Sequence, residues 1–135
     1  MKSKILFTCL VIFTFVTFSC KKESAPAIVG EWRMSAVYTN TTSGSYEWIT
    51  TIRFPELLTF NSDSKFSSFT DVPGGSGTYS YSRVSNELQL NFEADNWYPT
   101  RSTVLKVESL TKDKLVTLLT YASGIVRKNE YTRVN

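Results

Sequence analysis

Residues 77–93 read GTYSYSRVSNELQLNFE, and this stretch decides the expected fold. Apolar and polar side chains alternate on both sides of the short polar segment 84–86, and Leu88, Leu90 and Phe92 share one face. A period of two residues is typical of a β-strand with one buried face, and a connection this short joins antiparallel neighbours. The stretch therefore predicts a β-hairpin with one apolar face turned toward a core.

The same alternation continues over the rest of the chain from Ile28 onward, and no segment after residue 20 carries a helical stripe of apolar residues. We expect strands over 29–38, 57–61, 65–70, 77–83, 87–93, 103–110, 114–121 and 125–134, with a further extended segment over 46–54. The chain is therefore expected to be an all-β domain over residues 28–135.

The connections between these strands predict how they pair. Short polar segments at 62–64, 111–113 and 122–124 join consecutive strands as antiparallel neighbours, whereas 39–45, 71–76 and 94–102 are longer loops at a rim. A meander of eight strands avoids exposed edges most simply by closing on itself. We predict an eight-stranded antiparallel up-and-down β-barrel, whose interior is either filled by side chains or holds one small ligand.

Composition narrows the chemistry that this domain can perform. The 135 residues include no His and only two Cys, of which Cys9 lies inside an N-terminal apolar run. The commonest general base and metal ligand is therefore absent, and one remaining Cys forms neither a disulfide nor a thiolate metal cage within the chain. The nucleophile motif G-x-S-x-G is also absent. We expect no catalytic residues, no metal ion and no cofactor.

The N-terminus has the organisation of an export signal. Lys2 and Lys4 precede an apolar run over 5–18 that is too short to span a bilayer comfortably. The run ends at Ser19-Cys20, which resembles the lipobox of bacterial lipoproteins. The resemblance implies that residues 1–19 are a cleaved signal peptide and that Cys20 carries acyl chains such as palmitate, which insert into a membrane.

Residues 20–27 are then expected to be a polar tether between this anchor and the barrel. Loss of Lys2 and Lys4 lowers the formal charge from +3 to +1, which is too little for a nucleic-acid partner. In the lipoprotein resemblance, Lys21 after the acylated Cys is associated with the outer membrane. We expect an outer-membrane anchor in the cell envelope, on either the periplasmic face or the cell surface.

The head of the first expected strand, Gly30-Glu31-Trp32, resembles the G-x-W motif of lipocalins and of bacterial lipocalin-like lipoproteins. Further segments at 58–66, 77–81, 87–90 and 110–115 resemble hairpins of the same family. The resemblance implies that Gly30, Trp32 and a late arginine close one end of the barrel. Arg133 is the first choice for that arginine and Arg127 the second, and their role is structural.

Several aromatic residues remain as candidates for ligand contact. Tyr79, Tyr81 and Tyr121 are expected to face the barrel interior, where each phenol needs a polar partner. Trp48, Trp97 and Tyr98 stand in or beside the longer connections, where they stack on a ligand, contact a protein or cap the barrel mouth.

Two hypotheses for function follow. The first is non-catalytic binding of a small, partly apolar or amphipathic molecule by a monomeric barrel, in the interior or at its mouth. The alternative is a filled barrel whose aromatic loops dock an envelope protein, for example as an accessory module of a glycan-uptake complex. The first requires a cavity, whereas the second predicts a packed interior and an exposed patch around Trp48, Trp97 and Tyr98.

Overall fold

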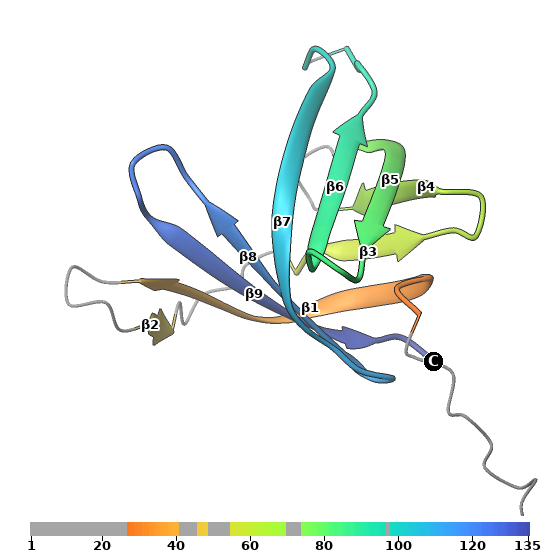
Figure 1. Cartoon of the computed structure of the whole chain (residues 1–135). Coiled ribbons are helices and arrows are strands. Elements are labelled where there is room, and N and C mark those ends of the chain that lie inside the picture. The colour runs from red at the N-terminus through yellow and green to blue at the C-terminus, as the bar shows by residue number, and fades with distance from the viewer. Residues whose placement is uncertain (1–26, 41–45, 49–54, 70–73, 97) are drawn as a thin grey trace, which may run out of the picture.

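The computed structural model describes residues 27–40, 46–48, 55–69, 74–96 and 98–135. Nine strands form one antiparallel sheet (Figure 1). They are β1 (Gly30–Asn40), β2 (Tyr46–Trp48), β3 (Leu57–Phe60), β4 (Lys65–Phe69), β5 (Ser76–Ser82), β6 (Glu87–Phe92), β7 (Arg101–Leu110), β8 (Lys114–Thr120) and β9 (Val126–Arg133). Among the described residues, no helix is long and apolar enough to cross a membrane.

The sheet closes because β1 pairs with both β3 and β9. Its first residues pair with β3 from Gly30 opposite Phe60, while its other edge pairs with β9 from Trp32 opposite Arg133 to Thr39 opposite Arg127. The ring contains eight strands, and β2 lies outside it on the last residues of β1. The predicted eight-stranded antiparallel barrel is therefore confirmed.

The strand ends fall within two residues of those predicted from the sequence. The expected segment over 46–54 is described only at β2, and residues 49–54 lie outside the described part of the chain. All pairings of the ring lie within residues 27–135, so a chain that begins at Ala25 contains the whole closed sheet.

Two register shifts bend the long strands into the ring. One lies between Met34 and Ala36 in β1, and the other between Val107 and Ser109 in β7. An extra residue on one strand of a pair increases its local twist and bend, which closure of a small barrel requires. At the β1 shift, the Ser35 hydroxyl donates a hydrogen bond to the Glu130 carbonyl oxygen at 3.2 Å.

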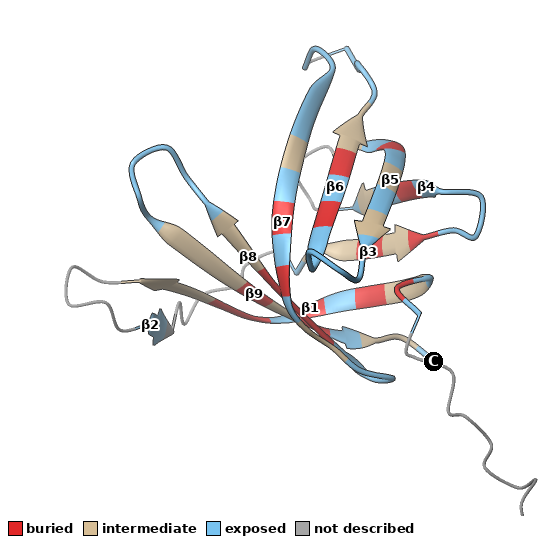
Figure 2. Cartoon of the chain, viewed as in Figure 1, coloured by how far each residue is buried: buried red, intermediate tan, exposed pale blue. Residues whose placement is uncertain are grey.

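The alternation that predicted the strands also marks the barrel interior. Buried and exposed positions alternate along β6 and β7 in Figure 2, and Leu88 and Leu90 on β6 are 0% and 4% exposed. The core comprises Ile28, Trp32, Met34, Val37, Leu58, Phe60, Phe66, Leu88, Leu90, Leu105, Val107, Leu115 and Tyr131. These side chains come from seven of the eight ring strands and from the segment before β1, so the ring surrounds one core.

One end of the barrel is closed by Trp32 and Arg133. The Trp32 side chain is fully buried, and its Nε1 donates a hydrogen bond to the Ile28 carbonyl oxygen at 2.8 Å. The Arg133 guanidinium carbon lies 4.1 Å from the centroid of the indole. The same guanidinium donates to the carbonyl oxygens of Ala27 at 2.8 Å, Val29 at 2.8 Å and Lys112 at 2.6 Å. We call this end of the barrel the closed end.

The strand directions assign the connections to the two ends of the barrel. The short turns 61–64, 83–86 and 111–113 lie at the closed end, where the chain also enters β1 and where the C-terminus lies beside the start of β1 (Figure 1). The longer connections that follow β1, β4 and β6 begin at the opposite end, which we call the open end. Access to the interior is therefore expected from the open end.

Gly30 is required where β1 meets Arg133. Its φ is +137°, and a Cβ there would overlap the Arg133 Nη1. Gly124, in the turn between β8 and β9, has a φ of +81° but open space around it. Both glycines therefore have a positive φ, which is unfavourable for residues with a side chain. Only Gly30 also lies against another side chain, that of Arg133.

We expect Gly30→Ala to lower the free energy of unfolding by about 2–4 kcal/mol, because it combines backbone strain with displacement of Arg133 from Trp32. Gly124→Ala is the matched control and should cost only about 1–2 kcal/mol, from the backbone alone. Urea unfolding of both variants measures the difference. Equal losses would show that the Arg133 contact does not stabilise the closed end.

Candidate functional site

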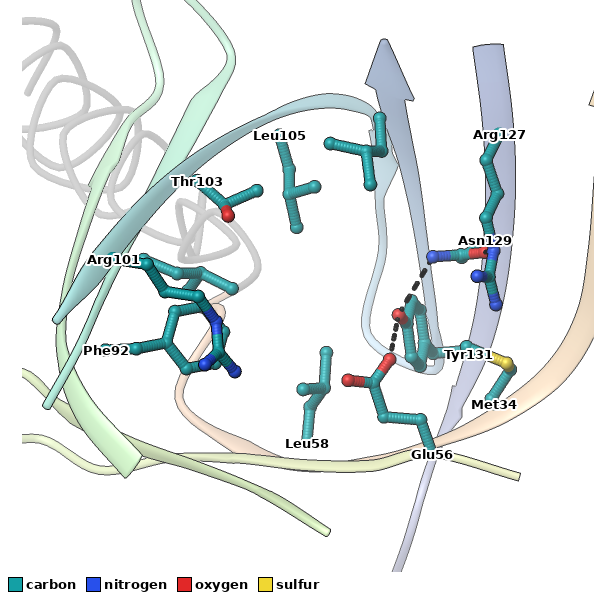
Figure 3. Close-up of a pocket in the computed structure, with 12 residues that line it drawn as sticks. Met34, Glu56, Leu58, Phe92, Arg101, Thr103, Leu105, Arg127, Asn129 and Tyr131 are labelled. Carbon is teal, nitrogen blue, oxygen red and sulfur yellow. Dashed lines mark hydrogen bonds between the residues drawn. The ribbon is translucent and has the colours of Figure 1, made fainter. Parts of the chain in front are cut away.

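A pocket of about 300 Å³ lies in the barrel toward the open end (Figure 3). One part of its lining is apolar and consists of Met34, Leu58, Leu90, Leu105 and Leu119, with Phe92 and Thr103 beside them. The other part is polar and consists of Glu56, Arg101, Arg127, Asn129 and Tyr131. The interior is therefore not completely filled by its own side chains.

Strand register brings these side chains to one cavity. Leu90 lies opposite Thr103 and Phe92 opposite Arg101 across β6 and β7, and Leu119 lies opposite Arg127 across β8 and β9. Directly paired residues in adjacent strands place their side chains on the same face of the sheet. All six therefore face the inside of the ring.

A chain of hydrogen bonds crosses the polar wall. The Ser68 hydroxyl donates to Glu56 Oε1 at 2.8 Å, and the Tyr131 hydroxyl donates to Glu56 Oε2 at 2.8 Å. Asn129 Nδ2 donates to the Tyr131 oxygen at 3.4 Å, and Arg127 Nε donates to Asn129 Oδ1 at 3.0 Å. Two of these contacts are drawn as dashed lines in Figure 3. The network fixes the orientation of Glu56, Tyr131 and Asn129.

Burial determines the protonation of Tyr131 in this network. Tyr131 is 1% exposed, and loss of water around its phenol, followed by the nearby negative charge of Glu56, raises the pKa of Tyr131 well above its ordinary value of 10.0. The phenol therefore stays neutral and remains a donor to the carboxylate.

Thr117, opposite Asn129 in the register, is fully buried, and its hydroxyl has no hydrogen-bond partner within the described part of the chain.

Arg101 contributes to the other wall through aromatic packing. Its guanidinium carbon lies 4.3 Å from the centroid of the Phe92 ring and 5.0 Å from that of Tyr98. Phe92 is itself held by an edge-to-face contact with Phe66, at 4.9 Å between centroids. Stacking of this kind positions a guanidinium without occupying its N–H donors.

The two inward tyrosines predicted on β5 do not line this pocket. The Tyr79 ring packs edge-on against Phe60 at 4.9 Å, and its hydroxyl donates to the Asn61 carbonyl oxygen at 2.8 Å. Burial, followed by the charge of Asp63, raises the pKa of Tyr79. Tyr81 is half-buried against the same core. Both side chains are part of the packing near the closed end.

Tyr121, predicted to face the barrel interior, is exposed and does not line the pocket. The alternation that buries Leu115 and Thr117 ends with β8 at Thr120, so Tyr121 begins the turn and is 42% exposed. Of the rim aromatics, Tyr98 is 44% exposed and contacts Arg101. Trp97 and the side chain of Trp48 lie outside the described part of the chain.

The polar wall was missed by the sequence reasoning, although the sequence contains a signal for it. Arg127, Asn129, Tyr131 and Arg133 occupy alternate positions of β9 and therefore one face. Because Arg133 is expected to face inward over Trp32, counting back in steps of two predicts that the other three also face inward. Arg127, the second choice for barrel closure, lies instead at the open end, opposite Thr39.

Comparison with known families agrees with this architecture. Residues 28–117 match the family model described as a lipocalin-like domain. The match covers most of the closed barrel, and the chain belongs to the family of lipocalin-like domains, as its resemblance to that family predicted. A comparison with curated proteins found no match. Small barrels of this type hold one small ligand when their interior is not filled.

The described residues contain no group of three or more His, Cys, Asp or Glu side chains that would hold a metal ion. The polar side chains of the pocket are instead one carboxylate, two guanidiniums, an amide, a phenol and the Thr103 hydroxyl. Such a set orients a ligand through hydrogen bonds and charge, while the leucines receive its apolar part.

We expect Tyr131→Phe to lower the free energy of unfolding by about 1–3 kcal/mol at neutral pH, because Glu56 loses a donor. The pKa of Tyr131 is raised in the folded state, so its contribution is present below pH 10.0 and is lost as pH rises through the folded pKa. The stability difference between the unsubstituted protein and Tyr131→Phe should therefore shrink above pH 10.0.

Urea unfolding at several pH values measures this difference. Tyr121→Phe is the matched control, since it removes a phenol from an exposed turn and should leave stability at neutral pH unchanged. A difference for Tyr131→Phe that stays constant across the alkaline range would contradict the assigned role of its phenol.

Proposed function

We propose that this protein binds one small, partly apolar molecule in the open-end pocket and does not transform it chemically. The observation that carries the proposal is the pocket itself, at about 300 Å³, with an apolar wall facing a fixed polar one. This volume lies at the lower end of the range for small-molecule sites, roughly 300–1,000 Å³. It corresponds to a ligand of about ten non-hydrogen atoms, because each water occupies about 30 Å³ in the liquid.

The two walls would contribute different parts of the binding free energy. Apolar ligand surface buried against Leu58, Leu90 and Leu105 contributes about 25 cal/mol per Å². The network of Glu56, Tyr131 and Asn129 is already held by hydrogen bonds before a ligand enters, so little ordering of these side chains accompanies binding. Affinity then comes from the apolar wall and orientation from the polar wall.

The alternative function, docking of an envelope protein by a filled barrel, is less well supported. It predicts a packed interior, whereas the described part of the barrel contains the pocket. The one rim aromatic whose side chain is described, Tyr98, packs against Arg101 of the pocket lining. This contact favours a role for Tyr98 at the rim of a ligand site.

We further propose that the barrel is anchored through an acylated Cys20 in the outer membrane of a cell envelope. The direction in which the chain enters the barrel supports this arrangement. Arg133 holds the carbonyl oxygens of Ala27 and Val29 at the closed end. A tether over 20–27 would therefore join the barrel at the end opposite the pocket, and the open end would face away from the membrane to which Cys20 is anchored.

A cavity-filling pair of variants tests the ligand site. Thr103→Trp places a large side chain inside the ring, whereas Val104→Trp places the same side chain on the outer surface, where Val104 is 53% exposed. We expect Thr103→Trp to weaken binding of the neutral probe 1-octanol by about tenfold or more, and Val104→Trp to change it less than about twofold.

Titrations followed by NMR of the chain from Ala25 measure both affinities and locate the affected amides. Native mass spectrometry of the same chain, purified from a cell envelope, looks for a bound cargo by its mass. Absence of any 1-octanol binding to the unsubstituted barrel would contradict the proposed function.

Substitution of the two cysteines tests the anchor. Cys20→Ser should abolish incorporation of an alkyne-tagged fatty acid and release the protein from the membrane fraction, because one or more acyl chains supply the membrane affinity. Cys9→Ser, inside the proposed signal peptide, is the control and should leave labelling and fractionation unchanged. Continued labelling of Cys20→Ser would contradict acylation at this residue.

A further inference from the structure

The pocket lining carries an excess of positive charge. Its ionisable side chains with a charge at neutral pH are Glu56, Arg101 and Arg127, so the lining has a net charge of +1 without a ligand. Glu56 and Arg127 are half-buried and Arg101 is exposed at the mouth, and charges in partly buried positions interact more strongly than the same charges in water. An occupant with one negative charge would neutralise the lining.

The carboxylate of Glu56 does not neutralise either arginine by direct contact. Its two oxygens accept hydrogen bonds from the hydroxyls of Ser68 and Tyr131, both of which are uncharged donors. No ion pair between Glu56 and an arginine is present among the described residues. The Glu56 carboxylate thus has its own hydrogen-bond donors, and within the described part of the chain neither arginine is paired with a carboxylate.

Each guanidinium is held in place while its terminal N–H groups make no hydrogen bond to the described residues. Arg127 is positioned through its Nε, which donates to Asn129, and Arg101 is positioned between the rings of Phe92 and Tyr98. Within the described part of the chain, neither guanidinium donates a hydrogen bond from its terminal nitrogens. A fork of preoriented N–H donors matches the geometry of a carboxylate.

The charged and apolar groups lie at different depths. Arg101 is the first residue of β7 and Arg127 the second of β9, so both stand at the open end. Leu58 pairs with Trp32 and therefore lies toward the closed end, and Leu105 lies two positions deeper than Thr103. Figure 3 shows Arg101 and Arg127 on opposite sides of the pocket, with Leu58 and Leu105 between them.

We infer that the pocket selects an amphiphile with one carboxylate, whose charged group lies at the mouth near Arg101 and Arg127 and whose apolar tail extends toward Leu58. This rests on the proposed function and adds the class and the orientation of its ligand. A pocket of about 300 Å³ accommodates about ten non-hydrogen atoms, which is the size of octanoate.

Three probes of matched length and different charge test the inference without any substitution. At neutral pH and low salt, we expect octanoate to bind about tenfold or more tightly than 1-octanol, and octylamine to bind more weakly than 1-octanol. Raising KCl from about 20 mM to about 500 mM should weaken octanoate binding and leave 1-octanol binding nearly unchanged. Titration of the chain from Ala25, followed by NMR or calorimetry, measures each affinity.

Substitutions assign the preference to the two arginines. Arg101→Gln and Arg127→Gln should each weaken octanoate binding about fivefold or more and change 1-octanol binding less than about twofold. Lys106→Gln is the control, because it removes one positive charge from the exposed outer face of β7. It should leave both affinities within about twofold of the unsubstituted protein.

The outcomes separate this inference from the proposed function. If octanoate and 1-octanol bind equally, or if octylamine binds more tightly, the carboxylate selectivity is wrong and the ligand site stands. If octanoate loses the same affinity in Lys106→Gln as in the arginine variants, general surface charge is responsible and the assignment to Arg101 and Arg127 is overturned. If none of the three probes binds, the proposed function fails and the inference fails with it.

Discussion

The stack of Arg133 over Trp32 is the contact on which the closure of the barrel depends, because it joins the first strand of the ring to the last. Its guanidinium lies 4.1 Å from the indole centroid and donates to three carbonyl oxygens of neighbouring segments. Gly30 leaves the space that this guanidinium occupies. Because packed side chains close one end, a ligand is expected to enter the interior from the opposite end. The closed end therefore stabilises the fold, and the open end gives access to the pocket.

The interior also contains polar groups that a purely structural core would not need. One connected network is formed by Ser68, Glu56, Tyr131, Asn129 and Arg127, and a partly buried network of this kind is costly unless its groups are satisfied. Because the network lies beside a cavity, a bound ligand can accept hydrogen bonds from its remaining N–H donors. The pocket thus combines preoriented polar groups with leucines that favour an apolar occupant.

The fold was predictable to within a few residues, whereas the site was not. Alternation at Leu88, Leu90 and Phe92 is a local property of the chain, and it sets both the strand and the face that is buried. The pocket depends on which inward residues meet across strands far apart in sequence, such as Glu56 with Tyr131. Tyr79 and Tyr81 face inward as expected, yet they pack near the closed end, where Phe60 and Asn61 occupy the space around Tyr79.

By itself, the sequence determined the strands and their antiparallel order, because side-chain periodicity and turn length act between neighbours along the chain. It also predicted the closure into a ring and the membership of the lipocalin-like family. Only the tertiary structure decided that the interior contains a pocket, that Arg133 and not Arg127 closes the barrel, and that Arg101 and Arg127 share one cavity. The physical reason is that a cavity is a difference between the volume enclosed by the ring and the volume of all side chains that point into it. That difference depends on the register of every strand at once.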